Sequence, residues 1–367
     1  MAIAMTVLCQ SFSQSVVKGR VVDAENGEAL PFATVFINNT TFGDITDQNG
    51  VFEINIPFGN HELVISYLGY QTFTFPFNTT SLREFYEFRI LPEPIELEES
   101  AVSEKRDRQW YRNLSIFKEK FLGKSVNADK CKIKNPEVLI LDSETKPGFL
   151  IARAKDILEI ENPNLGYLIR YVLMGFEYEI ESGKVSFAGY PYFIGENIPP
   201  RKMPRIQKNR ERAYKGSITH FMRSIFQETT ENDGFELFAS DKMKDKSNPE
   251  TGKILGTELI QKTEDNKVFL TYDKPFYVVY KNEKEEPNYR NLDAREGRAM
   301  LNLTGLATAT GGYEEILPQS SMIQMLGKAV QIFENGSYFH PLDIYLEGYM
   351  AWEKIADLMP FEYGMND

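Results

Sequence analysis

The chain has 367 residues, of which 42% are hydrophobic and 13% aromatic, so it can bury about two cores and is not a disordered chain. Its formal net charge of −12 and pI near 5.0 disfavour a nucleic-acid-binding protein, because such proteins normally carry a basic domain. With only Cys9 and Cys131, and Cys9 inside the N-terminal segment, we expect no disulfide in the mature chain.

Residues 1–15, "MAIAMTVLCQSFSQS", hold no charged side chain and place Ser11-Phe12-Ser13 after a short apolar run. This pattern predicts a secretory signal over residues 1–14, with cleavage after Ser13; a buried N-terminal strand is the alternative. Leu8 stands where a lipid-attachment motif needs a small residue before Cys9, so no lipid anchor is expected. No later segment reaches the ~20 apolar residues of a membrane helix. We therefore expect an exported protein of the periplasm or outer membrane surface, with no transmembrane segment in its mature chain.

Short runs of alternating apolar and polar residues, separated by turn signals, continue to about residue 92. This period of two predicts the strands of a β-sandwich over residues 15–92. In the run over residues 51–56, apolar Val51, Ile54 and Ile56 alternate with polar neighbours. The predicted strands lie at 16–24, 34–38, 51–56, 61–70, 71–77 and 83–91.

The stretch "DITDQNG", residues 44–50, resembles the polar part of a calcium-binding loop. An EF-hand loop needs oxygen ligands at positions 1, 3, 5 and 12 and a glycine at position 6. Aligning Gly50 with position 6 leaves Ile45 and Ile56 at positions 1 and 12. The motif therefore fails, and we expect a turn in which Asp47 caps backbone N–H groups and Gly50 has a positive φ.

Several of these features occur together in one known family. They are Gly19-x-Val21, Gly27, Ala33-x-Val35, Thr46-Asp47-x-x-Gly50-x-Phe52 and Gly69-Tyr70. The segment resembles the carboxypeptidase D regulatory-like domain, a transthyretin-like β-sandwich common in cell-envelope proteins of the Bacteroidota. The resemblance implies a seven-stranded β-sandwich without a zinc site.

Residues 93–107, which begin "EPIELEES", are acidic and follow Pro92, so they predict a linker. A helix should follow and end at Gly123, because Trp110, Leu114, Phe117 and Phe121 recur at spacings of 4, 3 and 4. Beyond it, strand patterns dominate, with hairpins around 147–148 and 182–183, and helical patterns interrupt them at 217–228 and 346–360. The sequence predicts an α+β domain over residues 108–367.

Phrases such as "LEIENPNLGYLIRYVL", "YKGSITHFMRSI" and "GYMAWEKIADLMPFEY" spread across residues 110–360. They resemble the second half of a group of uncharacterised exported Bacteroidota proteins. That resemblance implies a shared fold and export, and it brings no activity and no functional residue.

Motifs for catalysis are missing from the sequence. A zinc peptidase needs an HxxE pair and a third histidine, and none of His61, His220 and His340 supplies that pair. Ser217 and His220 are three residues apart without the G-x-S-x-G elbow of a serine hydrolase, so we expect Ser217 to cap a helix and His220 to pack or face solvent. No nucleotide-binding glycine loop occurs. Paired carboxylates for glycoside hydrolysis remain open, because their separation cannot be read from sequence.

One segment, "RKMPRIQKNRERAYKGS", is strongly basic within an acidic chain. It can be a docking patch for an anionic partner, such as lipid phosphates, anionic polysaccharide or an acidic protein face, or simply a solvated helix face. The candidate residues for this patch are Arg201, Lys202, Arg205, Lys208, Arg210, Arg212 and Lys215.

A second candidate surface is aromatic. Tyr190 and Tyr192 share a strand face beside Phe193, so the three rings form either an exposed platform for glycan stacking or a core layer.

The sequence therefore predicts a mainly β, α+β protein: a signal at 1–14, a seven-stranded β-sandwich at 15–92, a linker at 93–107 and an α+β domain at 108–367. We expect a non-enzymatic envelope protein that binds or scaffolds a protein or glycan partner, with no catalytic residue, cofactor or metal. The alternative is a hydrolase acting on peptides or glycans, with its site in the second domain.

Overall fold

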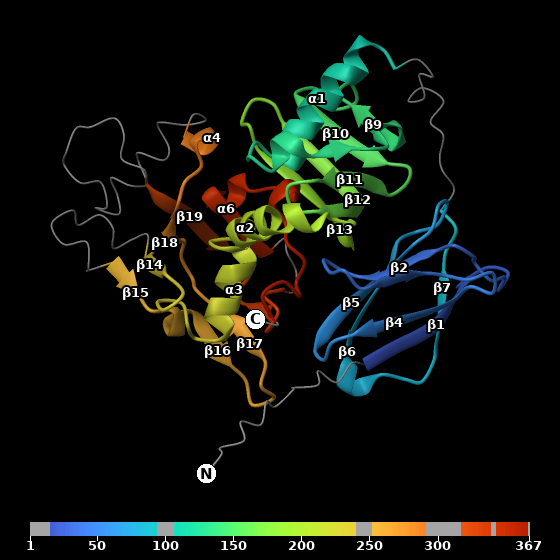
Figure 1. The fold of residues 1–367 in the computed structure, drawn as a ribbon, viewed down its shortest axis with the longest axis horizontal. Helices are drawn as coiled ribbons and strands as arrows, with labels where there is room; N and C mark the ends of the chain where they lie inside the picture. Colours follow the sequence, from blue (N-terminus) through green and yellow to red (C-terminus); the bar gives the residue numbers. More distant parts are fainter. Residues whose placement is uncertain (1–14, 94–105, 240–251, 291–316, 339–342, 366–367) are drawn as a thin grey trace. The chain divides into compact units, whose positions relative to one another are not determined.

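The computed structural model describes residues 15–93, 106–239, 252–290, 317–338 and 343–365. The predicted signal and most of the predicted linker lie outside these residues. The chain divides into two compact units: residues 1–98 together with 190–192, and residues 99–189 together with 193–367 (Figure 1). Each unit is described separately below.

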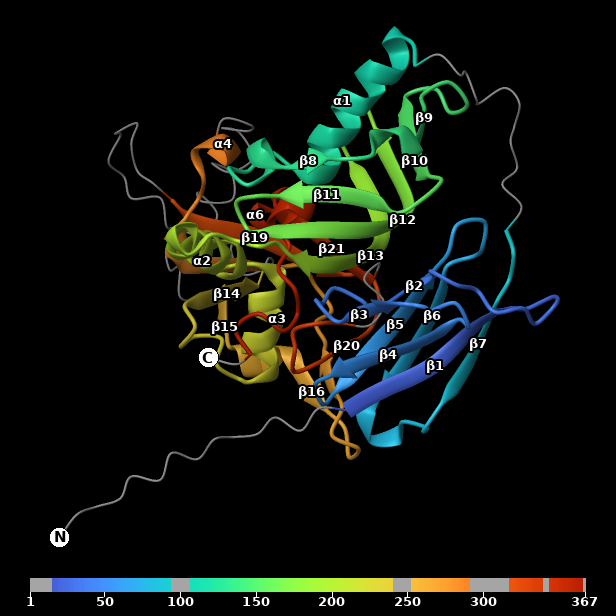
Figure 2. The same ribbon diagram turned by 45° about the vertical axis from the view of Figure 1, so that its right-hand side comes forward.

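The first unit is a β-sandwich whose described part contains seven strands in two sheets, the number that the family resemblance implied (Figure 2). The periodicity predicted six of them and missed β3, which lies where a turn was expected. One sheet has the order β4-β1-β7 and the other β3-β2-β5-β6. β7 runs parallel to β1, and the other neighbours are antiparallel. The strands are β1 (Ser15–Asp23), β2 (Thr34–Ile37), β3 (Gly43–Ile45), β4 (Val51–Ile56), β5 (Asn60–Ser66), β6 (Phe73–Asn78) and β7 (Tyr86–Ile90); a short 3-10 helix, η1 (Thr79–Ser81), links the last two.

The core between the two sheets is built by the inward residues of each strand. In β4 these are Phe52, Ile54 and Ile56, which are all buried, whereas Val51 is 36% exposed. The inward apolar set of this strand therefore includes Phe52 in place of Val51. Side chains on a strand alternate, so residues 51 and 54 point to opposite faces.

The turn between β3 and β4 has the predicted geometry. Asp47 Oδ1 accepts the N–H groups of Asn49 and Val51, both at 2.8 Å. Gly50 has φ +74°, and a Cβ on it would lie 2.5 Å from the carbonyl oxygen of Val21. The carboxylate of Asp47 in this turn therefore accepts hydrogen bonds from the backbone.

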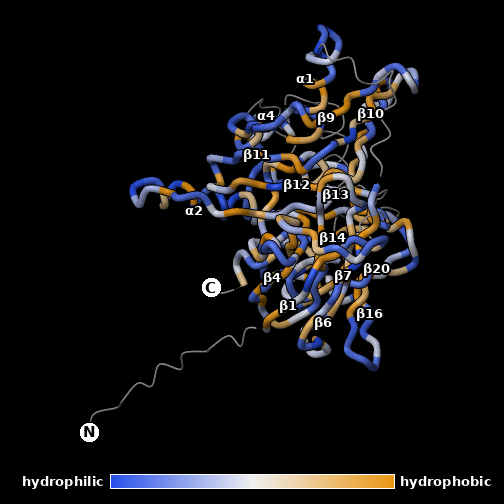
Figure 3. Tube along the Cα trace, turned by 90° about the vertical axis from the view of Figure 1, so that its right-hand side faces the viewer, coloured by the Kyte–Doolittle hydropathy of each residue, from blue (hydrophilic) through white to orange (hydrophobic). Residues whose placement is uncertain are grey.

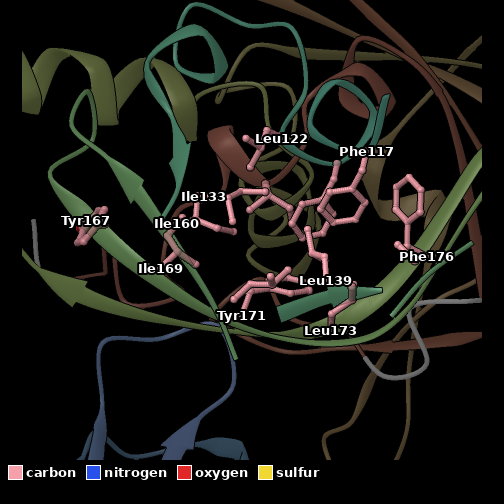
Figure 4. Packing of buried hydrophobic residues seen from close by; sticks show 14 of the residues in the cluster. Phe117, Leu122, Ile133, Leu139, Ile160, Tyr167, Ile169, Tyr171, Leu173 and Phe176 are labelled. Atoms are coloured by element: carbon pink, nitrogen blue, oxygen red, sulfur yellow. The ribbon is translucent and has the colours of Figure 1, made fainter. Parts of the chain in front are cut away.

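The second unit begins with α1 (Arg108–Leu122), which Asp107 caps at its N-terminus and Gly123 ends with φ +99°. Its buried stripe of Leu114, Phe117 and Phe121 packs on a sheet of order β8-β11-β12-β10-β9, with β13 also paired to β12 (Figure 4). The strands are β8 (Lys132–Ile133), β9 (Leu139–Asp142), β10 (Phe149–Ala154), β11 (Leu158–Asn162), β12 (Tyr167–Glu179) and β13 (Val185–Gly195), with η2 (Ala128–Lys130) and η3 (Pro136–Val138) in the loops. The predicted helix and both predicted hairpins are confirmed.

A second core follows in the same unit, formed by two sheets and the apolar face of α3. The sheets have the orders β15-β14-β18-β19-β21 and β16-β17-β20. The elements are η4 (Pro200–Lys202), α2 (Met203–Tyr214), α3 (Ile218–Phe226), β14 (Phe235–Ala239), β15 (Lys253–Ile254), η6 (Gly256–Leu259), β16 (Ile260–Lys262), β17 (Val268–Leu270), β18 (Phe276–Lys284), α4 (Pro287–Arg290), β19 (Pro318–Met325), β20 (Val330–Ile332), β21 (Ile344–Gly348), α6 (Tyr349–Trp352) and η8 (Ile355–Asp357).

The helix expected over residues 346–360 is not formed. Residues 344–348 pair with β19 as β21, and only short helical turns follow. Gly348 ends the strand with φ +80°, where a Cβ would lie 2.5 Å from the carbonyl oxygen of Ser320. The sheet therefore outweighs the helical pattern of the sequence.

The C-terminal residues are held by one buried cation, Arg223 of α3, which is 4% exposed. Its guanidinium donates to the carbonyl oxygens of Phe361 at 2.5 Å, Tyr363 at 2.6 Å and Asn335 at 3.1 Å. It also donates to the Tyr214 hydroxyl at 3.0 Å. A guanidinium can satisfy several acceptors in this way because its donors point outward in one plane.

Two glycines with the same φ provide a matched test of the turn that follows β3. Gly27 and Gly50 both have φ +74°, but a Cβ on Gly27 would meet no atom within 4 Å. We expect Gly27→Ala to lower the free energy of unfolding of the β-sandwich by about 1 kcal/mol, the usual cost of a left-handed alanine. Gly50→Ala should lower the same free energy by about 2 kcal/mol more, because its Cβ would overlap the carbonyl oxygen of Val21. Denaturant unfolding measures both, and equal losses would contradict this account.

Candidate functional site

The basic segment forms η4 and α2, and the structure divides its seven cations into two groups. Three are engaged within the unit. The Arg210 side chain donates from Nε to the carbonyl oxygen of Leu165 at 2.7 Å and lies over the Tyr167 ring. Arg212 forms an ion pair with Glu286 at 3.1 Å, and Lys215 forms one with Glu211 at 2.5 Å.

The other four cations, Arg201, Lys202, Arg205 and Lys208, are exposed. Within the described residues, none of them forms an ion pair. Arg201, Arg205 and Lys208 are spaced by four and three residues, so they share one side of the segment. α2 is hydrophilic along most of its length (Figure 3). We call these four residues the basic face.

The three residues of the candidate aromatic surface have different environments. Phe193 is fully buried and contacts the Tyr167 ring in an edge-to-face pair, so it cannot belong to an exposed platform. Its neighbour Tyr192 is half-buried and groups with the β-sandwich unit, where its ring stacks on Phe36. Tyr190, in the same group, is also half-buried, and burial raises the pKa of its hydroxyl. The alternative of a packing layer fits these rings better.

Ser217 and His220 do not form a nucleophile and a base. Ser217 caps α3 by accepting the N–H of His220, and its hydroxyl donates to the carbonyl oxygen of Tyr214. His220 Nδ1 accepts the N–H of Gly216, and its ring packs among Tyr214, Phe235 and Tyr280. Burial lowers the pKa of His220 to about 4, so it stays neutral. The expectation of a capping serine and a packed histidine is confirmed.

The structure also brings together a polar cluster that the sequence did not reveal. Its members come from four places in the second unit: the loop after α1, the helix α2, the end of β18 and the last turns of the chain. We call it the carboxyl cluster. It contains Glu283, Glu286, Glu353 and Asp357, with Ser125, Asn127 and Arg212 around them.

The contacts of the carboxyl cluster are specific. Asp357, which is 7% exposed, accepts hydrogen bonds at Oδ1 from the Ser125 hydroxyl at 2.9 Å and from Asn127 Nδ2 at 3.0 Å. Glu286 accepts the backbone N–H of Val126 at 2.9 Å in addition to its ion pair with Arg212. These hydrogen bonds thus join the loop after α1 to Glu286, just after β18, and to Asp357, near the C-terminus.

Three carboxyls of the cluster have raised pKa values, and burial is the first cause for each of them. Burial raises the pKa of Asp357 to about 6, although the hydrogen bonds from Ser125 and Asn127 lower it. Burial raises the pKa of Glu283 to about 7, with Arg212 opposing. The pKa of Glu353 lies well above its usual range, first because of burial and then because of the Asp357 and Glu286 charges. Asp357 therefore loses its proton as the pH rises through about 6 and Glu283 as it rises through about 7, whereas the pKa of Glu353 favours its protonated form.

The cluster does not have the form of a metal centre or an open active site. No group of three or more His, Cys, Asp or Glu in the described part of the chain could hold a metal ion. Asp357 Oδ2 and Asn127 Oδ1 are buried and have no hydrogen-bond partner among the described residues, which is the situation that an internal water usually satisfies.

A pocket of about 490 Å³ lies beside the end of α1, and none of the four carboxyls of the cluster lines it. Its lining includes Cys131, whose thiol pKa burial raises to about 12, so that thiol stays protonated. Lys118, Glu119, Lys124, Asp129 and Asn288 complete the polar lining.

The only local signals for this cluster were the run "EKEEP" at 283–287 and the i, i+4 pair Glu353 and Asp357. Neither signal links the two segments, because the hydrogen bond between Ser125 and Asp357 spans 232 positions.

Comparison with known proteins identifies the first unit. Residues 17–102 match the family model of the CarboxypepD_reg-like domain. The chain is also similar to cartilage intermediate layer protein 1 of Mus musculus, with 31% identity over 106 residues. That similarity covers 26% of this chain and only 9% of the mouse protein. The β-sandwich is therefore a CarboxypepD_reg-like domain, a class that indicates a binding or scaffold module.

Solved structures resemble the chain only weakly. One is a type II cohesin-X-dockerin complex from Acetivibrio cellulolyticus, with a TM-score of 0.16, 22% identity and coverage of 31% of this chain and 83% of the other. Another is a DUF3823 family protein from Bacteroides ovatus, with a TM-score of 0.18, 9% identity and coverage of 52% and 83%. No helix in the described residues is long and apolar enough to cross a membrane.

The carboxyl cluster predicts a distinct pH dependence of stability. Because the pKa of Asp357 is raised in the folded chain, the folded state binds this proton more tightly than the unfolded state. The contribution of the Asp357 proton to the stability of the fold is therefore full below about pH 4 and is lost as the pH rises through about 6. Asp357→Asn keeps the Oδ1 acceptor and removes the charge, so it should raise the free energy of unfolding at pH 8 by up to about 3 kcal/mol. At pH 4 it should have little effect.

Denaturant unfolding from pH 4 to 8 measures this difference. The matched control is Asp129→Asn, because Asp129 is exposed and lies on η2 near the same loop. The two variants should differ in the slope of stability against pH; equal slopes would show that Asp357 is not the titrating group.

Proposed function

We propose that this chain is an exported, non-enzymatic protein of the bacterial cell envelope that binds an anionic partner through the basic face of the second unit. The observation that carries the proposal is four exposed cations without an ion pair in the described residues, on a chain with a net charge of −12. The CarboxypepD_reg-like domain supports a binding or scaffold role. The signal pattern of residues 1–14 supports export.

The chemistry of the basic face favours phosphate or carboxylate groups. Arginine side chains at 201 and 205 offer planar forks of donors, and Lys202 and Lys208 add point charges. An acidic chain repels most anionic surfaces, so a local basic face gives orientation as well as attraction. We favour an acidic protein or glycan of a transport or surface-assembly system as the partner.

The alternative function, a hydrolase, has less support. The hydroxyl of Ser217 and the Nδ1 of His220 are each bonded to backbone groups. The carboxyl cluster lies outside the lining of the one pocket described. No particular observation therefore favours hydrolysis over binding.

Charge reversal of the basic face tests the proposal. The triple variant Arg201→Glu, Arg205→Glu and Lys208→Glu should retain at most about a tenth of the binding to purified outer membranes in a low-salt co-sedimentation assay. Arg210 and Arg212 are left unchanged because their side chains support the fold. High salt should also lower the fraction of the unchanged chain that sediments with the membranes, because salt screens the charges of the basic face.

The matched control reverses three exposed lysines elsewhere in the second unit: Lys130→Glu, Lys132→Glu and Lys184→Glu. It changes the net charge by the same amount and should keep most of the binding. If both variants lose binding equally, net charge and not the basic face is responsible. Fractionation of cells that express the full chain tests export separately, and recovery in the cytoplasm would refute that part.

A further inference from the structure

The β-sandwich has four edge strands, and three of them are closed to further pairing. On β4, the outward N–H groups of Val51 and Glu53 are bonded to Asp47 Oδ1 at 2.8 Å and Asp44 Oδ2 at 3.0 Å. Asp44 Oδ1 also accepts the outward N–H of Ile45 on β3, at 2.8 Å. On β6, the middle outward position is Pro76, which has no N–H. Carboxylate caps and proline are common ways to block an edge.

The remaining edge, β7, is open along its middle. The carbonyl of Ile90 faces β1, where it accepts the N–H of Ala24, and the carbonyl of Leu91 faces away, where it accepts the N–H of Gln71. Because these directions alternate along a strand, Glu87 and Arg89 direct their backbone groups away from β1. No strand in the described residues pairs with this outer side.

The side chains of β7 make this open edge complementary to itself. Glu87 and Arg89 are exposed, at positions two apart on the same face, with Phe88 buried between them. If two copies of β7 pair antiparallel about a two-fold axis at Phe88, Glu87 of each copy lies opposite Arg89 of the other. Both are positions with outward backbone groups, so they form hydrogen-bonded pairs, with four backbone hydrogen bonds in all.

Other registers allowed by the backbone are less favourable. Moving the axis to residue 87 or 89 places glutamate opposite glutamate, or arginine opposite arginine, and like charges directly opposite destabilise a sheet. The axis at Phe88 also brings Phe85 of one copy toward Leu91 of the other. Each of these two side chains is 51% exposed in the single chain. The charged and the exposed apolar side chains therefore favour the register with its axis at Phe88, and they favour β7 of a second copy as the added strand.

We propose that two copies of this chain associate through β7, with their strands antiparallel and the two-fold axis at Phe88. The two three-stranded sheets then form one sheet of order β4-β1-β7-β7-β1-β4. This isologous contact is closed by its symmetry and leaves no further open edge of the same kind. The ladder is short, since Gln71 already bonds Leu91, so the dimer is weak and depends on protein concentration.

Sedimentation velocity of the full chain over a wide concentration series tests the proposal. The unchanged chain should shift from monomer to dimer as concentration rises. Arg89→Pro removes an N–H that faces away from β1, so it should abolish the dimer and leave the β1–β7 ladder in place. Arg89→Ala keeps that N–H and is its matched control, expected to retain more of the association.

Charge variants keep the proposal testable if the proline variant fails to fold. Glu87→Arg places two arginines opposite each other and Arg89→Glu two glutamates, so each variant alone should dimerise about tenfold more weakly. An equal mixture of the two should form a mixed dimer, because both cross-strand pairs then have opposite charges. A chain that stays monomeric at every concentration, or a dimer that these variants leave unchanged, would overturn the proposal.

Discussion

Every polar group that folding removes from water in this protein needs a partner, and this requirement organises both units. Arg223 is the clearest case: one buried guanidinium satisfies three carbonyls and a hydroxyl, and so holds the end of the chain against α3. Leaving such groups without partners costs more than the hydrogen bonds themselves contribute. The places where the requirement is met only partly are therefore the informative ones.

The carboxyl cluster is such a place. Four carboxyls gather around Arg212, so they cannot all be ionised without a large electrostatic cost. Protonation solves the problem, and it ties the packing of the chain's last turns to pH. Arg212 follows Lys208 by four residues and lies on the same side of the segment, so one helix both neutralises buried acid and presents the exposed cations of the basic face. α2 thus joins a structural requirement to the proposed binding surface.

The β-sandwich applies the same rule to its edges. Asp44 and Asp47 satisfy backbone groups that would otherwise invite another strand. The polar turn at residues 44–50 therefore closes an edge, which explains its composition without calcium. β7 lacks such caps and instead presents a glutamate and an arginine two residues apart. Because three edges of this CarboxypepD_reg-like domain are closed, a further strand can pair with it only along β7.

The sequence by itself determined what depends on near neighbours. Period-two patterns predicted the sandwich strands, the spacing of Leu114, Phe117 and Phe121 predicted α1, and Ser217 was correctly expected to cap α3. Asp47 and Gly50 set their turn, because a side chain there reaches backbone only a few residues away.

Tertiary structure alone decided what depends on distant partners. It buried Phe193 and turned residues 344–348 into a strand beside β19. It also separated the engaged cations from the basic face and joined Ser125 to Asp357 across 232 positions. A sequence pattern records which faces are apolar or charged, but not which other segment meets them. The carboxyl cluster and the basic face both depend on contacts between distant segments, so they became visible only in the folded chain.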